Sequence, residues 1–228
     1  MTAPPRPDLR LYAVLDPARC RGRPLPDTAA AAARGGATLL QYRDKAAAGD
    51  GARGLVANAR AILAALHPFG VPLVVNDRVD VALAAGAAGA HVGRTDMDPA
   101  DARRLLGPGA ILGVTVHHAH EADGLAPGLA TYAGLGPVHP TLTKDPGDPP
   151  LGPEGLARLV REVHARLPGL PTTGIAGIDH ANAPAVIAAG VDGVAVVSDI
   201  FAADDVEAAT RRLRAAVDAA LAARGRTA

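Results

Sequence analysis

The sequence predicts a single-domain α/β protein that folds as a (β/α)8 TIM barrel, and three observations predict this class. Short apolar runs alternate with alanine-rich helical segments along most of the 228 residues. The apolar runs are nearly continuous, as is typical of parallel strands buried on both faces. Glycine-containing segments at 35–37, 86–90 and 190–193 each end a helix and lead into a strand. Eight such units in about 220 residues match the size of this barrel.

A doubly wound open sheet is the alternative arrangement of alternating strands and helices. That fold normally carries a glycine-rich dinucleotide fingerprint after its first strand. The corresponding position here holds Asp16 and Pro17. The sequence therefore favours the barrel.

Each element follows from its local pattern. The expected strands are 9–15, 38–43, 72–75, 89–92, 111–115, 131–135, 171–174 and 194–197. The expected helices lie between them and include 28–34, 51–66, 79–85, 99–106 (with proline in its first turn), one that opens near Glu154, and 206–223. These bounds give a Pro-rich tail over 1–8, the barrel over 9–223 and a C-terminal tail over 224–228.

Composition excludes several classes of protein. The net charge is zero and the basic residues are scattered, which argues against nucleic acid or an anionic membrane as a partner. The single cysteine, Cys20, excludes an internal disulfide and fits a reducing cytoplasm. Residues 1–7 lack an apolar core, so we expect no signal peptide. No apolar run approaches the roughly 20 residues of a membrane helix.

Rare residue types mark candidate functional positions. Arginine and alanine dominate this chain, whereas lysine occurs only as Lys45 and Lys144, glutamine only as Gln41 and serine only as Ser198. A compact ammonium and a planar guanidinium are not interchangeable, so a lysine retained against this bias indicates a specific task. In a barrel, such residues act at the carboxyl ends of the strands.

The second strand ends in polar residues. Its period of two places Gln41, Arg43 and Lys45 on one side, facing the barrel mouth. A solvated strand end is the alternative interpretation. The amide and the two cations together favour an anion-binding wall.

Carboxylates follow the third and fourth strands. Asp77 comes after Asn76, and Asp96 follows the next strand. Neighbouring strands are about 4.8 Å apart, so both carboxylates can converge on one Mg2+ that also binds substrate phosphate. Asp96 could instead cap the fourth helix, but Asp98, which directly precedes Pro99, fits that role better.

The Gly- and Pro-rich loop after the sixth strand carries Thr141, Thr143 and Lys144, which supply two hydroxyls and a cation to the same metal-assisted anion site. A second anion site, lined by backbone amides, is expected after the seventh and eighth strands. Gly177 follows the seventh strand, and Val197 and Ser198 end the eighth, where barrels of this class often bind phosphate. Two anion sites predict two phosphorylated substrates, one of which carries enough charge to need a metal.

Three histidines follow the fifth strand, at His117, His118 and His120. Their spacing raises the possibility of zinc, but no cysteine or second cluster completes a ligand set. A loop with one helix cap is the favoured interpretation.

Taken together, the motifs resemble those of the thiamine phosphate synthase family. The resemblance spans residues 11–203 in six ordered segments: 40–45, 75–78, 91–96, 113–117, 134–144 and 196–198. It implies a (β/α)8 barrel that joins hydroxymethylpyrimidine diphosphate to a thiazole phosphate with Mg2+ and releases diphosphate.

The resemblance also implies residue roles. Asp77 and Asp96 would hold Mg2+, and Thr115 stands where the family usually has serine. The pyrimidine diphosphate would be held by Gln41, Arg43, Lys45, Asn76 and Lys144, and the thiazole phosphate by Thr141, Thr143, Gly177, Val197 and Ser198. Tyr42, Ala176 and Asp199 depart from the family pattern, the last two beside the expected thiazole phosphate site.

Two other functions remain open at this point. A thiazole tautomerase of the same superfamily would use a histidine shortly before the sixth-strand loop, where this chain has Gly136 and Pro137. A non-catalytic barrel that binds thiamine precursors would not need the carboxylate pair and both lysines. We expect a cytoplasmic enzyme, and a homo-oligomer is compatible with the sequence.

Lys144 is expected to act mainly in the transition state, with Arg43 and Lys45, on the charge that develops on the leaving diphosphate. Lys144→Ala should lower kcat by about 100-fold or more, because a preorganised charge partner is lost. Lys144→Arg should rescue poorly, since the guanidinium differs in shape. Steady-state kinetics in which only KM changes would contradict this role.

Overall fold

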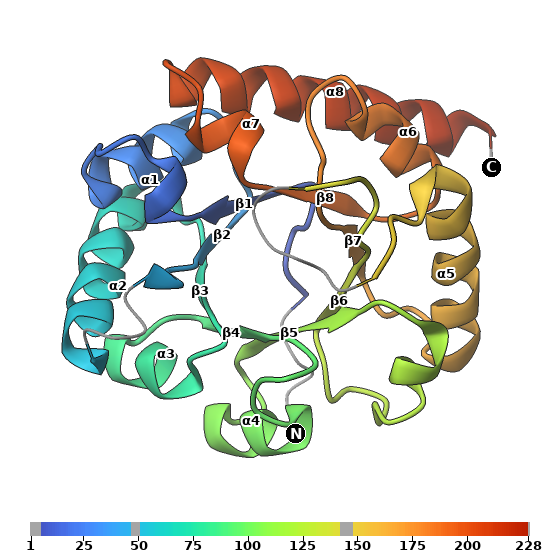
Figure 1. Ribbon diagram of the computed structural model, residues 1–228, viewed down its shortest axis with the longest axis horizontal. Helices are drawn as coiled ribbons and strands as arrows, with labels where there is room; N and C mark the ends of the chain where they lie inside the picture. Colours follow the sequence, from blue (N-terminus) through green and yellow to red (C-terminus); the bar gives the residue numbers. More distant parts are fainter. Residues whose placement is uncertain (1–5, 47–50, 142–147, 228) are drawn as a thin grey trace.

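Eight parallel strands close into a barrel in the order β1 to β8, with β8 paired to β1. The computed structural model describes residues 6–46, 51–141 and 148–227. Helices surround the strands as an outer ring (Figure 1). The predicted (β/α)8 barrel is confirmed, and the closing β1–β8 pair excludes an open doubly wound sheet.

The strands begin and end within two residues of the predicted positions. They are β1 (Leu11–Leu15), β2 (Leu39–Tyr42), β3 (Leu73–Asn76), β4 (Gly89–Val92), β5 (Ile111–Val116), β6 (Tyr132–Leu135), β7 (Thr172–Gly174) and β8 (Gly193–Val196).

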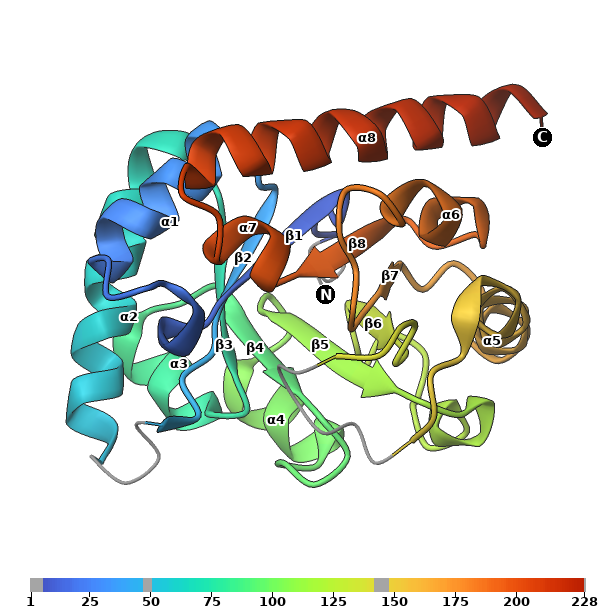
Figure 2. The same ribbon diagram turned by 45° about the horizontal axis from the view of Figure 1, so that its top comes forward.

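The helices follow the strands in chain order. They are α1 (Leu25–Arg34), α2 (Ala52–Leu66), α3 (Val79–Ala85), α4 (Pro99–Leu106), α5 (Gly152–Arg166), α6 (Ala183–Ala188), α7 (Ser198–Phe201) and α8 (Val206–Thr227), with short 3-10 helices η1 (Pro17–Arg19), η3 (His67–Phe69) and η4 (Ala119–Ala122). Helix α8 lies across the outside of α1, α7 and α6 (Figure 2).

Two details differ from the sequence prediction. The connection from β5 to β6 holds only η4 instead of an α-helix, because Gly124, Pro127 and Gly128 interrupt helical backbone there. The segment 224–228, predicted as a tail, continues α8 as far as Thr227. Arg224 fixes this last turn by donating to the carbonyls of Ile187 and Val191, at 2.9 and 2.6 Å.

Among the described residues, no helix is both long and apolar enough to cross a membrane.

The apolar residues form two layers. A large outer layer lies between the strands and the helices. A smaller layer fills the barrel interior and contains Leu9, Tyr12, Val14, Leu39, Val74, Ile111, Tyr132 and Ala195. The interior layer forms a floor, and the site must lie above it at the carboxyl ends of the strands.

Glycine at two strand positions allows close approach inside the barrel. A Cβ atom added at Gly89 would overlap the backbone of Ile111 on β5. One added at Gly113 would overlap the Tyr132 ring and lie 2.5 Å from Nδ1 of His91. The interior therefore accepts its large aromatic rings only where neighbouring strands lack side chains.

Replacing Gly89 with alanine should lower the free energy of unfolding by about 2 kcal/mol or more, because backbone atoms cannot move aside as a side chain can. Gly54→Ala is the matched control. Gly54 is exposed on α2 with nothing within 4 Å of an added Cβ, so this change should raise stability by roughly 0.5–1 kcal/mol. Urea unfolding measures both, and equal effects would contradict the close approach of β4 and β5.

Candidate active site

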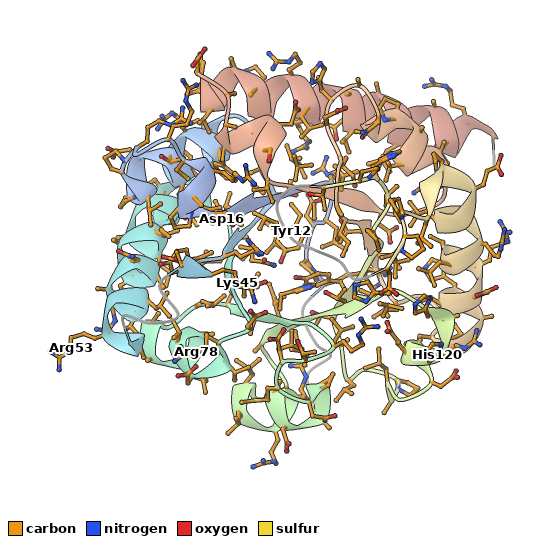
Figure 3. All side chains as sticks on the ribbon, in the orientation of Figure 1. Tyr12, Asp16, Lys45, Arg53, Arg78 and His120 are labelled. Atoms are coloured by element: carbon orange, nitrogen blue, oxygen red, sulfur yellow. The ribbon has the colours of Figure 1, made fainter. Side chains whose placement is uncertain are left out.

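A cavity of about 640 Å³ opens at the carboxyl ends of the strands. Tyr12, Asp16 and Lys45 lie inside the ring of helices, whereas Arg53 points outward from α2 (Figure 3). Of the predicted site residues, those that line the cavity are Gln41, Arg43, Lys45, Asn76, Asp77, Asp96, Thr115, Thr141, Gly177, Val197 and Ser198. Thr143 and Lys144 lie outside the described residues. The structure thus brings the other predicted residues together.

The end of β2 supplies the cationic wall, and both cations are paired with carboxylates. Arg43 forms an ion pair with Asp16, and the two side chains are only 11% and 8% exposed. Lys45 forms an ion pair with Asp77 and is itself 51% exposed. Arg43 is therefore fixed in direction, while Lys45 remains accessible from solvent.

Asp16 is a site residue that the sequence reasoning missed. Its Oδ1 accepts a hydrogen bond from the backbone N–H of Ala18 at 3.0 Å, which caps η1, and its other oxygen holds Arg43. Leu15 pairs with Tyr42 in the β1–β2 register, so the next residues of the two strands, Asp16 and Arg43, become neighbours. The sequence feature that could have revealed this role is an aspartate directly after the first strand.

Asp77 and Asp96 converge beside Lys45, as predicted. Their carboxyl groups lie close enough that each shifts the pKa of the other, and Asp96 Oδ2 accepts from the backbone N–H of Gly93 at 2.8 Å. Asp77 has a left-handed backbone, with φ of 62°, an arrangement that costs energy outside glycine and recurs at functional sites. Asp98, not Asp96, caps α4 by accepting from the N–H of Ala100 at 2.8 Å.

The two carboxyl groups titrate as a pair. Burial raises the pKa of Asp96, and the hydrogen bond to Asp77 raises it further. Burial acts the same way on Asp77, but hydrogen bonds to Asp96 and Lys45 outweigh it, so the pKa of Asp77 is lowered. Two carboxylates held this close favour either a shared proton or a cation between them.

This donor set fits Mg2+ better than a metal that needs a closed protein cage. Among the described residues, no group of three or more His, Cys, Asp or Glu side chains is arranged to hold a metal ion. Two carboxylates at an open cavity leave positions for water and substrate phosphate, which is the usual coordination of Mg2+. Asp77 and Asp96 are therefore its candidate ligands.

The opposite wall comes from the loops after β7 and β8. Gly177 has φ of 65° and accepts a hydrogen bond at its carbonyl from Asn182 Nδ2 at 2.9 Å. An added Cβ there would lie 2.5 Å from the Pro140 carbonyl oxygen, so glycine lets the β6 and β7 loops meet. Val197 and Ser198 stand at the start of α7, the short helix that follows β8.

The structure shows the surroundings of the three residues that depart from the family pattern. Asp199 Oδ1 lies 3.0 Å from Nδ1 of His180, and its other oxygen accepts from the His180 backbone N–H. Ala176 has φ of 73°, a conformation that glycine adopts at lower cost. Tyr42 packs in the outer layer and hydrogen-bonds Asp44 and Asn58, away from the cavity.

His118 forms the N-cap of η4 in a capping box with Glu121. This confirms the predicted helix cap in the histidine segment. His118 and His120 stack with ring centroids 5.5 Å apart, and His117 lines the cavity.

A buried polar chain crosses the cavity floor, and sequence reasoning did not predict it. Gln41 Nε2 donates to the Tyr12 hydroxyl, which lies 2.6 Å from the Tyr132 hydroxyl. The Tyr132 hydroxyl is 2.9 Å from His91 Nδ1, and His91 Nε2 is 2.9 Å from Thr115 Oγ1. Its two ends are the predicted substrate residues Gln41 and Thr115. The sequence feature that could have revealed this chain is the set of polar residues at inward-facing strand positions.

These features define a class of protein: a (β/α)8-barrel enzyme with cationic, carboxylate and glycine-rich walls suited to phosphorylated ligands. Residues 11–200 match the model of the thiamine monophosphate synthase family. Thiamine-phosphate synthases from Agrobacterium fabrum and Xanthobacter autotrophicus are 50% and 48% identical to this chain, each over 95% of it and over 97% and 99% of the relative. The solved thiamine phosphate pyrophosphorylase of Pyrococcus furiosus has a TM-score of 0.82 and 33% identity, and the match covers 95% of this chain and 98% of that one.

The chain therefore belongs to the thiamine monophosphate synthase family. It is a transferase with thiamine-phosphate synthase activity. The comparisons support neither a thiazole tautomerase nor a non-catalytic binding barrel.

Loss of the Asp16 charge should destabilise the fold around Arg43. Asp16→Asn should lower the free energy of unfolding by about 3 kcal/mol, because the largely buried guanidinium loses the charge of Asp16. Asp80→Asn is the matched control, since Asp80 pairs with Arg78 on the surface, where both are at least 40% exposed; it should change stability by less than about 0.5 kcal/mol. Equal losses in urea unfolding would contradict a buried Arg43–Asp16 pair.

Proposed function

We propose that this enzyme joins 4-amino-2-methyl-5-hydroxymethylpyrimidine diphosphate to 4-methyl-5-(2-phosphoethyl)thiazole, forming thiamine monophosphate and diphosphate. The observation that carries this proposal is the single wall on which Arg43 and Lys45 stand next to the Asp77–Asp96 carboxyl pair. Cations and a divalent-metal site side by side suit a diphosphate. We further propose that the reaction takes place in the cytoplasm on small-molecule substrates only.

The diphosphate binds at the β2–β4 wall in this mechanism. Arg43 is held in place by Asp16, so its guanidinium meets the developing charge without reorganising. Lys45 leaves Asp77 for the diphosphate once the carboxylates are otherwise neutralised. Asn76, on the neighbouring strand, adds an amide donor, and Lys144 supplies a third cation. Mg2+, when bound by Asp77 and Asp96, would neutralise further charge on the leaving group.

Bond breaking needs no general base. The methylene carbon of the pyrimidine separates from the diphosphate oxygen with the electron pair leaving on that oxygen, and the electron-rich aminopyrimidine ring stabilises the cation. The thiazole nitrogen then forms the new bond with its own lone pair. The residues of the chain contribute positioning and charge stabilisation, which are large terms in catalysis.

The thiazole phosphate is assigned to Thr141, Thr143, Gly177, Val197 and Ser198, of which Gly177, Val197 and Ser198 form the opposite wall. Gly177 allows the backbone to approach the ligand closely. Ser198 offers a hydroxyl at the start of α7. The Asp199 carboxylate is turned toward His180 and accepts from its backbone N–H.

Magnesium affinity tests this function. With only two protein carboxylates, the free enzyme should bind Mg2+ weakly, and pyrimidine diphosphate should tighten binding by about tenfold or more. Asp77→Asn and Asp96→Asn should each abolish this coupling in titration calorimetry. Asp98→Asn is the matched control: Asp98 only caps α4, asparagine caps equally well, and coupling should persist. Tight stoichiometric metal in the free enzyme, or full activity without Mg2+, would refute the proposal.

A further inference from the structure

The hydrogen bonds of the polar chain on the cavity floor all run the same way, from donor to acceptor, and the Gln41 end determines which way. An amide nitrogen can only donate a hydrogen bond, so the Tyr12 hydroxyl accepts from Gln41 Nε2. Tyr12 has one proton, and the hydroxyl group within reach of it is that of Tyr132, at 2.6 Å. Tyr12 is only 1% exposed, so a hydroxyl proton left without an acceptor would carry a desolvation cost. Tyr12 therefore donates to Tyr132.

The same reasoning continues to the other end. Tyr132 is fully buried and now accepts from Tyr12, so its own proton goes to Nδ1 of His91. A ring nitrogen that accepts carries no proton, and the neutral ring then has its proton on Nε2. That N–H donates to Thr115 Oγ1 at 2.9 Å. The Thr115 hydroxyl proton is consequently turned away from His91.

Burial disfavours ionisation of both tyrosine hydroxyls. Burial raises the pKa of Tyr12 despite its hydrogen bonds to Tyr132 and Gln41. Burial also raises the pKa of Tyr132, and the proximity of Tyr12 raises it further. The geometry of the hydrogen bonds thus makes each group of the chain donate to the next.

We infer that this one-way chain fixes the hydrogen-bonding polarity of the pyrimidine pocket, with His91 and Tyr132 as positioning residues for substrate selectivity. At one end Gln41 Oε1 remains as an acceptor, and at the other the Thr115 hydroxyl remains as a donor. An aminopyrimidine offers the complementary pattern, an exocyclic N–H donor and ring-nitrogen acceptors. A 4-oxopyrimidine places a carbonyl acceptor where the amino donor stood, so it meets the Gln41 Oε1 acceptor unfavourably and loses that hydrogen bond.

The inference rests on the proposed pyrimidine substrate, but its first test does not. Histidine tautomers are distinguished by the 15N signals of their two ring nitrogens. In the free wild-type enzyme, His91 should be neutral with its proton on Nε2. Tyr132→Phe removes the acceptor of Tyr12 and the donor to His91, and the ring should then lose this single tautomer.

The second test compares substrates. Wild-type enzyme should prefer the 4-aminopyrimidine diphosphate over its 4-oxo analogue. Tyr132→Phe should reduce the ratio of the two kcat/KM values by about 10- to 100-fold. This is the effect expected when one or two hydrogen bonds no longer distinguish the two substrates. A purely structural role would lower kcat/KM for both substrates equally.

Tyr42→Phe is the matched control, because Tyr42 is the third tyrosine of the chain and lies in the outer layer at 1% exposure. It should change neither the His91 tautomer nor the substrate ratio. Thermal unfolding verifies that each variant folds, and Tyr12→Phe, which frees Gln41 but leaves Tyr132 beside His91, gives a second variant for the substrate ratio should Tyr132→Phe not fold.

The outcomes separate this inference from the proposed function. A proton on Nδ1 of His91, a doubly protonated ring at neutral pH, or an unchanged substrate ratio in the network variants would overturn the inference while thiamine monophosphate is still formed. Failure to couple the two substrates, with the His91 proton on Nε2, would instead refute the assigned reaction and leave the direction of the chain intact.

Discussion

The interior of the barrel accommodates two tyrosine rings, and the rest of the site depends on how they fit. The rings of Tyr12 and Tyr132 meet edge to face with centroids 5.6 Å apart, a favourable arrangement for aromatic pairs. They come from β1 and β6, and Gly113 leaves the space into which Tyr132 extends. Because this floor is closely packed and hydrogen-bonded, the groups above it have fixed positions. The cavity can then present donors and charges without first reorganising.

The walls of the cavity differ in how they are supported. Arg43 and the Asp77–Asp96 pair stand at or just beyond strand ends and are held by ion pairs, hydrogen bonds or burial. On the other side, Gly177 lies in the loop after β7, and Ser198 is the first residue of the short helix α7 after β8. The rigid wall carries the groups that must meet a developing charge, which is where preorganisation contributes most. The loop wall has the simpler task of binding a phosphate whose charge does not change.

Much of this arrangement can be predicted from the sequence, because it follows from periodicity. Alternation along β2 indicates that Gln41, Arg43 and Lys45 share a side, and strand ends identify Asp77 and Asp96 as neighbours. What sequence cannot supply is register. The Arg43–Asp16 pair depends on the alignment of Leu15 with Tyr42, and the polar chain depends on which inward residues of β1, β2, β4, β5 and β6 lie at one level. The missing α-helix between β5 and β6 was foreseeable from its glycines and proline, whereas the length of α8 depended on Arg224 reaching the α6–β8 connection.

The pairing of β1 with β8 also governs the order in which the molecule is completed during synthesis. Tyr12 has Ala195 as its strand partner on that side, so the edge of β1 stays unpaired until Ala195 has been synthesised. Synthesis of that length takes roughly 10–40 seconds on a ribosome. Until then the first and the most recent strand each present unpaired backbone groups to other nascent chains. The short strands of this barrel limit that exposure to a few residues each. Helix α8 packs over α1, α6 and α7, so it covers the outside of the barrel near the junction of β8 with β1.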